Sequence, residues 1–419
     1  MMLAQKNQNI YQIFYFLCIA VTYLNNYELT FFVWGLTFLL TIRKTYSLQI
    51  IKLILPFILI LFVATIISFF EDYKLFYKIR DLTYLSKPIL GLLVGYQLFR
   101  RKDSLSNAWL KLINVGLIIA LVHLAIAFFV IIKNKSFYIN DIRAAGGYFS
   151  DYEIYILILL IFKDKFKINI TTKKRNLLLL IIGLSSFLYL SRTNFLQLII
   201  LYLGIKGYLI LTKKSIKVFL ITTISVLIGY SAILYYNPKR QGTGLDGFLY
   251  KMKNAPIEPF KTKIDKGDWK DFNDNYRSYE NIITVKQVSY NGFWAIMFGE
   301  GLGSRLNLGR KVLSNDGEYV QFIPYVHNAY MTVFLKSGIL GVVLLIYFIF
   351  LLYKTGKRFI KQNEIPIGNL LIGSSIFLIL SNWVFLGFYL KLDNKSILIG
   401  FIIAIAEQLV KNKKTLDAK

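Results

Sequence analysis

The stretch Ile50–Phe70, "IIKLILPFILILFVATIISFF", decides the fold, because it runs for about 20 residues with a single charge, Lys52. A helix of that length crosses roughly 30 Å of hydrocarbon. In lipid such a run must be helical, since its backbone groups find no water to bond. Comparable runs recur along the 419 residues, which are 56% hydrophobic. The sequence predicts an all-α integral membrane protein.

Apolar runs of suitable length predict about twelve transmembrane helices. They lie near residues 10–24, 27–42, 51–70, 84–99, 110–132, 151–162, 177–190, 193–211, 216–236, 329–353, 367–390 and 396–410. The chain then divides into an N-terminal bundle of about nine helices (1–236), one large, partly helical loop (237–326) and about three C-terminal helices (327–419). A connection as long as this loop is usually functional.

The basic residues predict the orientation. With a cytoplasmic N-terminus, every strongly basic short loop falls on the cytoplasmic side, for example 100–102, 163–175 and 354–361. Both termini are then cytoplasmic, and the large loop faces the periplasm or the cell exterior. The net charge of +27 therefore comes mostly from basic residues that set the orientation of the helices and face the lipid headgroups. We expect no nucleic-acid partner.

The run Ser191-Arg192-Thr193 lies at the outer end of a predicted helical hairpin. Two interpretations of Arg192 stay open. Its side chain could reach the lipid headgroups, or its guanidinium could bind phosphate oxygens in a bidentate manner.

Within the large loop, an amphipathic helix is expected from about Tyr276 to Trp294, with Arg277 in its first turn. A cation near a helix N-terminus opposes the helix dipole. Arg277 therefore needs an anionic partner, which is Glu280, another acid of the loop, or the phosphate of a ligand.

A glycine-rich turn, Gly299, Gly301 and Gly303, follows this helix. Glycine has no Cβ, so such a turn lets a ligand approach the backbone closely. The turn does not follow a predicted strand, and a dinucleotide-binding fold is not indicated.

The two histidines of the chain lie in different settings. His327 and Asn328 begin a predicted helix, whose N-terminal dipole disfavours imidazolium, and a neutral imidazole suits a general base. The alternative is helix capping by either residue, without chemistry. His123 lies within a predicted span, where we expect a buried, hydrogen-bonded side chain, with proton relay as the second reading.

A resemblance follows from the spacing after His327. In "HNAYMTVFLKSGILG", His327-Asn328 is followed by nine residues, Gly338, two residues and Gly341. This resembles the H-[NSQ]-x9-G-x-x-G signature of the bacterial O-antigen polymerase and O-antigen ligase superfamily. The "SRT" and "YRSYE…FGEGLGS" runs, the predicted spans and the large outer loop are similar to that family too.

The resemblance implies an inverting, metal-independent glycosyl transfer at the periplasmic face of the bacterial plasma (inner) membrane, without cofactors. The donor would be a glycan on undecaprenyl diphosphate. Arg192 and Arg277 would bind the diphosphate and stabilise the charge that grows on it. His327 would orient or deprotonate the acceptor hydroxyl.

Further substrate-binding residues follow from the same resemblance. The run "KIRDLTYLSKPILGLLVGY" nominates Arg80 and Lys87, and "DIRAAGGYFSDYE" nominates Arg143 as a phosphate contact. Asn328, Gly301 and Gly303 complete the expected substrate-binding set.

Three functions remain open. The first is polymerisation of O-antigen or capsular repeat units, favoured because no distinct lipid A-core recognition signal is visible. The second is ligation of the glycan to lipid A-core. The third, a flippase or transporter, is less favoured because the polar candidates gather at one surface rather than in mid-membrane. The expected partners are the lipid-linked donor, a glycan or lipid A-core acceptor, membrane lipid and a chain-length regulator.

Overall fold

The computed structural model describes residues 2–99, 104–135, 139–210, 212–240, 245–265, 267–313 and 317–417. Helix accounts for 75% of the structure. The only sheet in these ranges is an antiparallel pair, β1 (Leu306–Leu313) and β2 (Tyr319–Ile323). The prediction of a helical protein is confirmed, whereas the strand pair was not predicted.

Each predicted span coincides with a helix. These helices are α1 (Met2–Ala20), α2 (Tyr27–Leu40), α3 (Leu48–Phe69), α4 (Leu75–Leu98), α5 (Leu105–Asn134), α7 (Asp151–Ile161), α8 (Thr172–Leu188), α9 (Arg192–Ile205), α10 (Lys213–Tyr236), α15 (Ala329–Lys361), α16 (Ile365–Val384) and α17 (Lys395–Asp417). Of the described helices, five (α3, α5, α10, α15 and α16) are long and apolar enough to cross a membrane by length and composition.

The outward faces of several helices are strongly apolar. Phe69, Phe129 and Ile132 are 79%, 65% and 75% exposed, and none of the apolar window of α10 is buried. Large exposed apolar surfaces are rare on soluble monomers, because water disfavours them. The surface and the five long helices together indicate a membrane protein.

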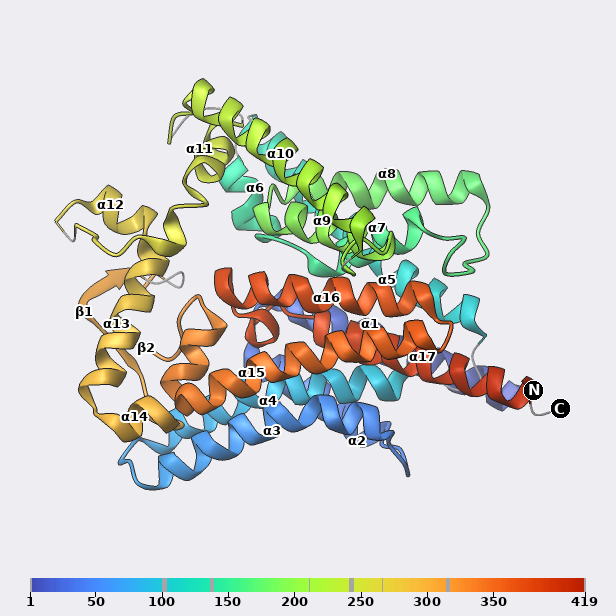
Figure 1. The fold of residues 1–419 in the computed structure, drawn as a ribbon, viewed down its shortest axis with the longest axis horizontal. Helices are drawn as coiled ribbons and strands as arrows, with labels where there is room; N and C mark the ends of the chain where they lie inside the picture. The colour runs from blue at the N-terminus through green and yellow to red at the C-terminus, as the bar shows by residue number, and fades with distance from the viewer. Residues whose placement is uncertain are drawn as a thin grey trace.

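The long helices lie side by side (Figure 1). α15 packs on α3 and α16, α17 packs on α4, and α9 packs on α16. In Figure 1 the start of α1 and the end of α17 lie at one end of the bundle, while the elements of the large loop lie at the other. The bundle therefore separates the chain ends from the loop.

The large loop folds around a small apolar core of its own. Its elements are α11 (Asp246–Asn254), a 3₁₀ turn (Glu258–Phe260), α12 (Trp269–Asp274), α13 (Tyr276–Tyr290), α14 (Phe293–Phe298), β1 and β2. Tyr279, Val288, Leu306 and Leu308 are buried in this core. The predicted helix to Trp294 is wrong at its end, because Gly292, with φ of 89°, separates α13 from α14.

Four glycines allow this loop to pack closely on the bundle. A Cβ added at Gly299 (φ 80°) would lie 2.4 Å from the backbone of Lys336, and one added at Gly338 (φ 63°) would lie 2.3 Å from the backbone of Met297. Added Cβ atoms would lie 2.7 Å from Ser68 N at Gly301 and 2.6 Å from Tyr73 Cβ at Gly303. The sequence predicts a ligand beside Gly301 and Gly303, but the protein's own chain occupies that space.

A buried ion pair completes this attachment. Lys336 Nζ lies 2.6 Å from Asp81 Oδ2, and both side chains are at most 2% exposed. Lys336 also donates to Ser304 O over 2.5 Å, and Gly303 N–H donates to Asp81 over 2.8 Å. Two helices, α4 and α15, thus bind one end of the glycine-rich turn.

Candidate active site

Three arginines nominated from the sequence converge at the loop end of the bundle. Arg143 comes from α6 (Ile139–Gly146), Arg192 from the start of α9 and Arg277 from the start of α13. Arg192 Nη2 lies 3.4 Å from one Glu258 oxygen, and Arg277 Nη1 lies 3.5 Å from the other. Partial burial, and then the charge of Arg192, lowers the pKa of Arg143. We call Arg143, Arg192, Lys251 and Arg277 the cation cluster.

Sequence reasoning did not single out Lys251 or Glu258. The backbone oxygen of Lys251 accepts a hydrogen bond of 2.6 Å from Arg192 Nη1. Although Lys251 is exposed, partial desolvation, followed by repulsion from Arg143, Arg192 and Arg277, lowers its pKa to about 8. The acid predicted as the partner of Arg277 is thus Glu258, one of the alternatives left open, and not Glu280.

The cation cluster is short of negative charge. In the described part of the chain no carboxylate pairs with Arg143, and its Nε is buried without a hydrogen-bond partner. The guanidinium groups of Arg143 and Arg277 lie over the rings of Tyr148 and Phe385, at 5.4 and 4.8 Å. Cations that are partly withdrawn from water favour counter-charges, and oriented guanidinium groups suit phosphate oxygens. The arrangement can bind a multiply charged anion.

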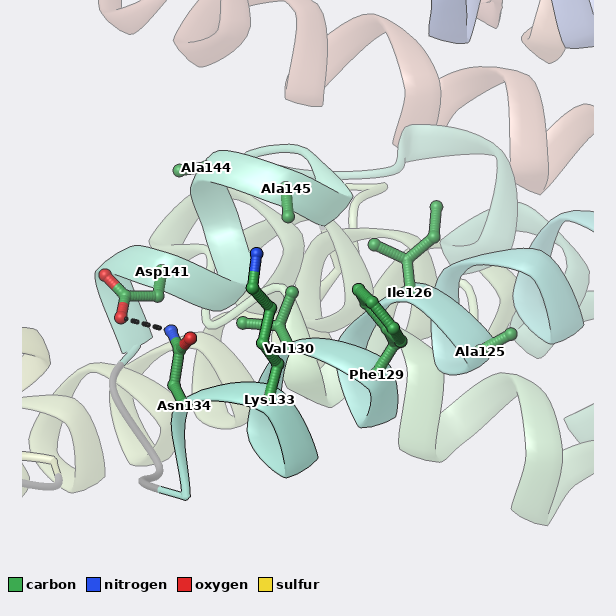
Figure 2. A pocket seen from close by; sticks show the side chains of 9 residues that line it. All are labelled: Ala125, Ile126, Phe129, Val130, Lys133, Asn134, Asp141, Ala144 and Ala145. Carbon is green, nitrogen blue, oxygen red and sulfur yellow. Dashed lines mark hydrogen bonds between the residues drawn. The ribbon is translucent and has the colours of Figure 1, made fainter.

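Helix α6, which carries Arg143, also borders an apolar groove. Figure 2 shows this groove between α5 and α6, with a volume of about 750 Å³. Its lining is mostly apolar, with Lys133, Asn134 and Asp141 as the polar members beside Ala125, Ile126, Phe129, Val130, Ala144 and Ala145. A hydrogen bond of 2.8 Å from Asn134 Nδ2 to Asp141 Oδ2 joins the two helices at one end.

His327 is paired with a buried carboxylate. Its backbone N–H donates to Glu280 Oε2 over 2.8 Å, and its Nδ1 lies 3.0 Å from the same oxygen. The Glu280 side chain is 1% exposed, whereas that of His327 is 49% exposed. A carboxylate at Nδ1 fixes that nitrogen as the donor and leaves Nε2 as the acceptor. Sequence reasoning emphasised the helix dipole and named Glu280 only as a candidate partner of Arg277, whereas the structure places its carboxyl group against the imidazole of His327.

Asn328 is the N-cap of α15. Its Oδ1 accepts from Met331 N over 3.2 Å, and the residue is 1% exposed. This confirms the capping alternative for Asn328 and gives its amide oxygen a structural partner. The expected substrate contact of Asn328 stays a prediction.

Helix α13 connects the cation cluster to His327. Arg277 and Glu280 are three residues apart and therefore share a face of this helix. A second link runs through Phe385. Its ring lies under the Arg277 guanidinium, and its backbone oxygen accepts a hydrogen bond of 3.1 Å from the backbone N–H of Ala329, two residues after His327. A basic anion site and a histidine–carboxylate pair thus lie next to each other.

Two nominated cations have partners elsewhere. Arg80 Nη2 lies 3.0 Å from Asp81 and its guanidinium lies over Tyr77. Lys87 is 2% exposed and donates to the backbone oxygens of Leu390 and Lys391. The contacts of Arg80 stay within α4, whereas those of Lys87 attach α4 to the backbone at Leu390 and Lys391. The structure does not bring either residue into the cation cluster.

His123 is a core residue, as one of its two readings predicts. It is 3% exposed, its Nδ1 lies 2.8 Å from Ser185 Oγ, and its ring stacks on Tyr189 at 3.6 Å. The buried, hydrogen-bonded side chain is confirmed.

Within the ranges that the structure covers, no group of three or more His, Cys, Asp or Glu residues is placed to hold a metal ion. No protein-family model matches the chain, and no curated protein matches its sequence. The function is therefore argued from the site itself.

The lowered pKa of Lys251 predicts that anion binding at the cation cluster depends on pH. Below about pH 8 the ammonium group contributes to binding, and as the pH rises through that value the contribution is lost. We expect the affinity for a prenyl-diphosphoryl sugar, whose own charge is constant here, to fall about five- to tenfold from pH 7 to pH 9. Titration of the purified protein in detergent measures this.

The Lys251→Arg variant should bind equally well across that range, because arginine stays charged. Lys253→Arg, on the same helix, is the matched control and should keep the wild-type pH dependence. The same fall in affinity with Arg at position 251 would show that another group titrates.

Proposed function

We propose that this protein is a membrane glycosyltransferase that polymerises O-antigen or capsular repeat units from undecaprenyl-diphosphate-linked glycans. The observation that carries the proposal is the convergence of Arg143, Arg192, Arg277 and Lys251. Among the described residues, Glu258 is the one carboxylate that forms an ion pair with this cluster, through Arg192 and Arg277. These arginines come from three distant segments, and a diphosphate is an anion that such a cluster can hold.

The reaction assigns a role to each group. The acceptor oxygen forms a bond to the anomeric carbon as the bond from that carbon to the phosphate oxygen breaks, which inverts the configuration. The cation cluster stabilises the negative charge that develops on the departing diphosphate. The acceptor proton passes to His327 Nε2, while Glu280 holds Nδ1–H.

The apolar groove between α5 and α6 supports a lipid-linked donor. It lies on the helix that carries Arg143, and an isoprenoid chain needs an apolar surface of this kind close to its charged headgroup. The nine residues from Ala125 to Lys133 of α5 rise by about 13 Å, close to half of the hydrocarbon thickness.

The proposal includes a topology. All twelve apolar helices cross the bacterial inner membrane, both termini are cytoplasmic, and the loop 237–326 is periplasmic. The separation of the chain ends from the loop in Figure 1 supports this arrangement, as do the basic short loops on the side of the termini.

Ligation to lipid A-core is the alternative, since it uses the same donor site and differs only in the acceptor. A reconstituted assay separates the two, using a defined undecaprenyl-diphosphate repeat unit with and without lipid A-core. Polymer formed without lipid A-core identifies a polymerase, and product formed only with lipid A-core identifies a ligase. Failure to transfer under both conditions would contradict the proposed function.

A further inference from the structure

A second hollow, of about 540 Å³, lies in the large loop away from the cation cluster. Gln287 and Tyr290 of α13, Glu300, Arg305, Phe322 of β2 and Tyr73 from the α3–α4 turn line it. Its volume falls within the range of small-molecule binding sites. None of these side chains has a role in the proposed transfer step.

The polar part of this hollow is preorganised. Glu300 is 6% exposed, and its two oxygens accept from Gln287 Nε2 and Asn291 Nδ2 over 2.8 and 3.0 Å. Gln287 Oε1 in turn accepts from Asn307 N over 2.9 Å. A carboxylate offers about four acceptor positions, so the Glu300 carboxylate can accept further hydrogen bonds from a ligand.

The walls of the hollow are aromatic and exposed. Tyr290 and Phe322 are 91% and 45% exposed. The Arg305 guanidinium lies 4.2 Å from the Tyr77 ring centre and 5.1 Å from that of Phe322, which holds Phe322 in place. Aromatic faces beside fixed amide, carboxylate and guanidinium groups match a sugar ring, which has an apolar C–H face and a rim of hydroxyls.

Both walls continue into the candidate active site. Gln287 lies seven residues after Glu280 on α13, about 10 Å along the helix. Glu280 itself is buried, and the partly exposed Tyr276, whose ring centre lies 6.1 Å from that of His327, and Ile283 form the accessible surface between His327 and Gln287. On the other wall, β2 ends at Ile323, and the chain reaches His327 four residues later. A chain of sugars that starts at the acceptor position can therefore follow α13 into the hollow.

We infer that this hollow is a subsite that holds an oligosaccharide segment of the growing glycan, at a distance from the bond that forms. The inference rests on the proposed function and adds a binding element to it. The subsite makes the affinity for the acceptor depend on its number of sugars, because only a glycan of several units reaches from the acceptor position beside His327 to the hollow.

The test combines Tyr290→Ala with Phe322→Ala in the full-length protein reconstituted in nanodiscs. For an acceptor of several repeat units we expect KM to rise about tenfold with kcat unchanged, since two stacking contacts are lost. For an acceptor of one repeat unit, KM should not change. Tyr235→Ala, which removes a 94% exposed tyrosine from α10, is the control. Glu300→Gln should give the same length-dependent effect without removing a ring.

The outcomes separate the two proposals. If the wild type transfers glycan and the double variant shows an unchanged KM for both acceptors, the subsite is refuted and the proposed function stands. If the wild type transfers nothing, the proposed function fails. Saturation-transfer NMR with oligosaccharide released from the cell's own surface polysaccharide then tests the subsite, and absence of binding overturns it as well.

Discussion

Arg192→Ala and Arg277→Ala are each expected to lower glycosyl transfer by about 10²- to 10³-fold. Each removes a guanidinium group that pairs with Glu258 and belongs to the cation cluster, which is proposed to bind the diphosphate. Because the charge on the diphosphate grows as the glycosidic bond breaks, the loss should fall mainly on kcat. Arg277→Lys should recover only part of the activity, since an ammonium group cannot form a bidentate contact. The measurement is turnover of a defined lipid-linked repeat unit.

Arg175→Ala provides a matched control, because it removes a partly exposed arginine from the first turn of α8. All three variants should be present in the membrane in equal amounts and elute alike on gel filtration. Normal polymer formation by a correctly inserted Arg192→Ala or Arg277→Ala protein would show that the cation cluster does not bind the donor.

His327→Ala is expected to lower transfer by about 10²- to 10⁴-fold, because the acceptor loses its proton-accepting partner. Glu280→Gln should lower it less, since the amide oxygen can still accept from Nδ1 but carries no charge. If Glu280 acts only through His327, the double variant should be no slower than His327→Ala alone. Single-turnover rates for the four proteins of this cycle provide the measurement.

Two outcomes would contradict these roles. Wild-type rates for His327→Ala would exclude His327 as the base and as an element that positions the acceptor. Effects of Glu280→Gln and His327→Ala that multiply in the double variant would mean that Glu280 acts independently of the imidazole. Thermal unfolding in detergent checks that Glu280→Gln leaves the loop folded.

The apolar helices could be predicted because hydropathy is a local property, although only five of those in the described ranges are long and apolar enough to cross a membrane. All twelve predicted spans coincide with helices, and the largest boundary error is at α4, which starts at Leu75 rather than near 84. The polar residues of that first turn suggest a loop. The structure keeps them helical, however, and buries Asp81 by pairing it with Lys336. A distant partner of this kind has no periodic signature.

Partners that are distant in the sequence could not be predicted at the candidate site either. The prediction of arginines as anion ligands rests on residue chemistry and motif, and the structure does gather Arg143, Arg192 and Arg277. Glu280 lies 47 residues before His327 and Glu258 lies 66 residues after Arg192, so neither pairing follows from spacing. Glycine spacing, for its part, does not distinguish close approach of a ligand from close approach of the protein's own backbone.

The buried pair of Asp81 and Lys336 has a consequence for biosynthesis. The two residues are 255 positions apart in the chain, which corresponds to roughly 10 to 50 seconds of translation. Until α15 emerges from the ribosome, Asp81 lacks its ammonium partner and the glycine-rich turn lacks half of its attachment. The large loop (237–326) therefore leaves the ribosome before it can dock. In the topology proposed above, a nascent chain that stops short of α15 would present this loop to the periplasm undocked and open to proteases.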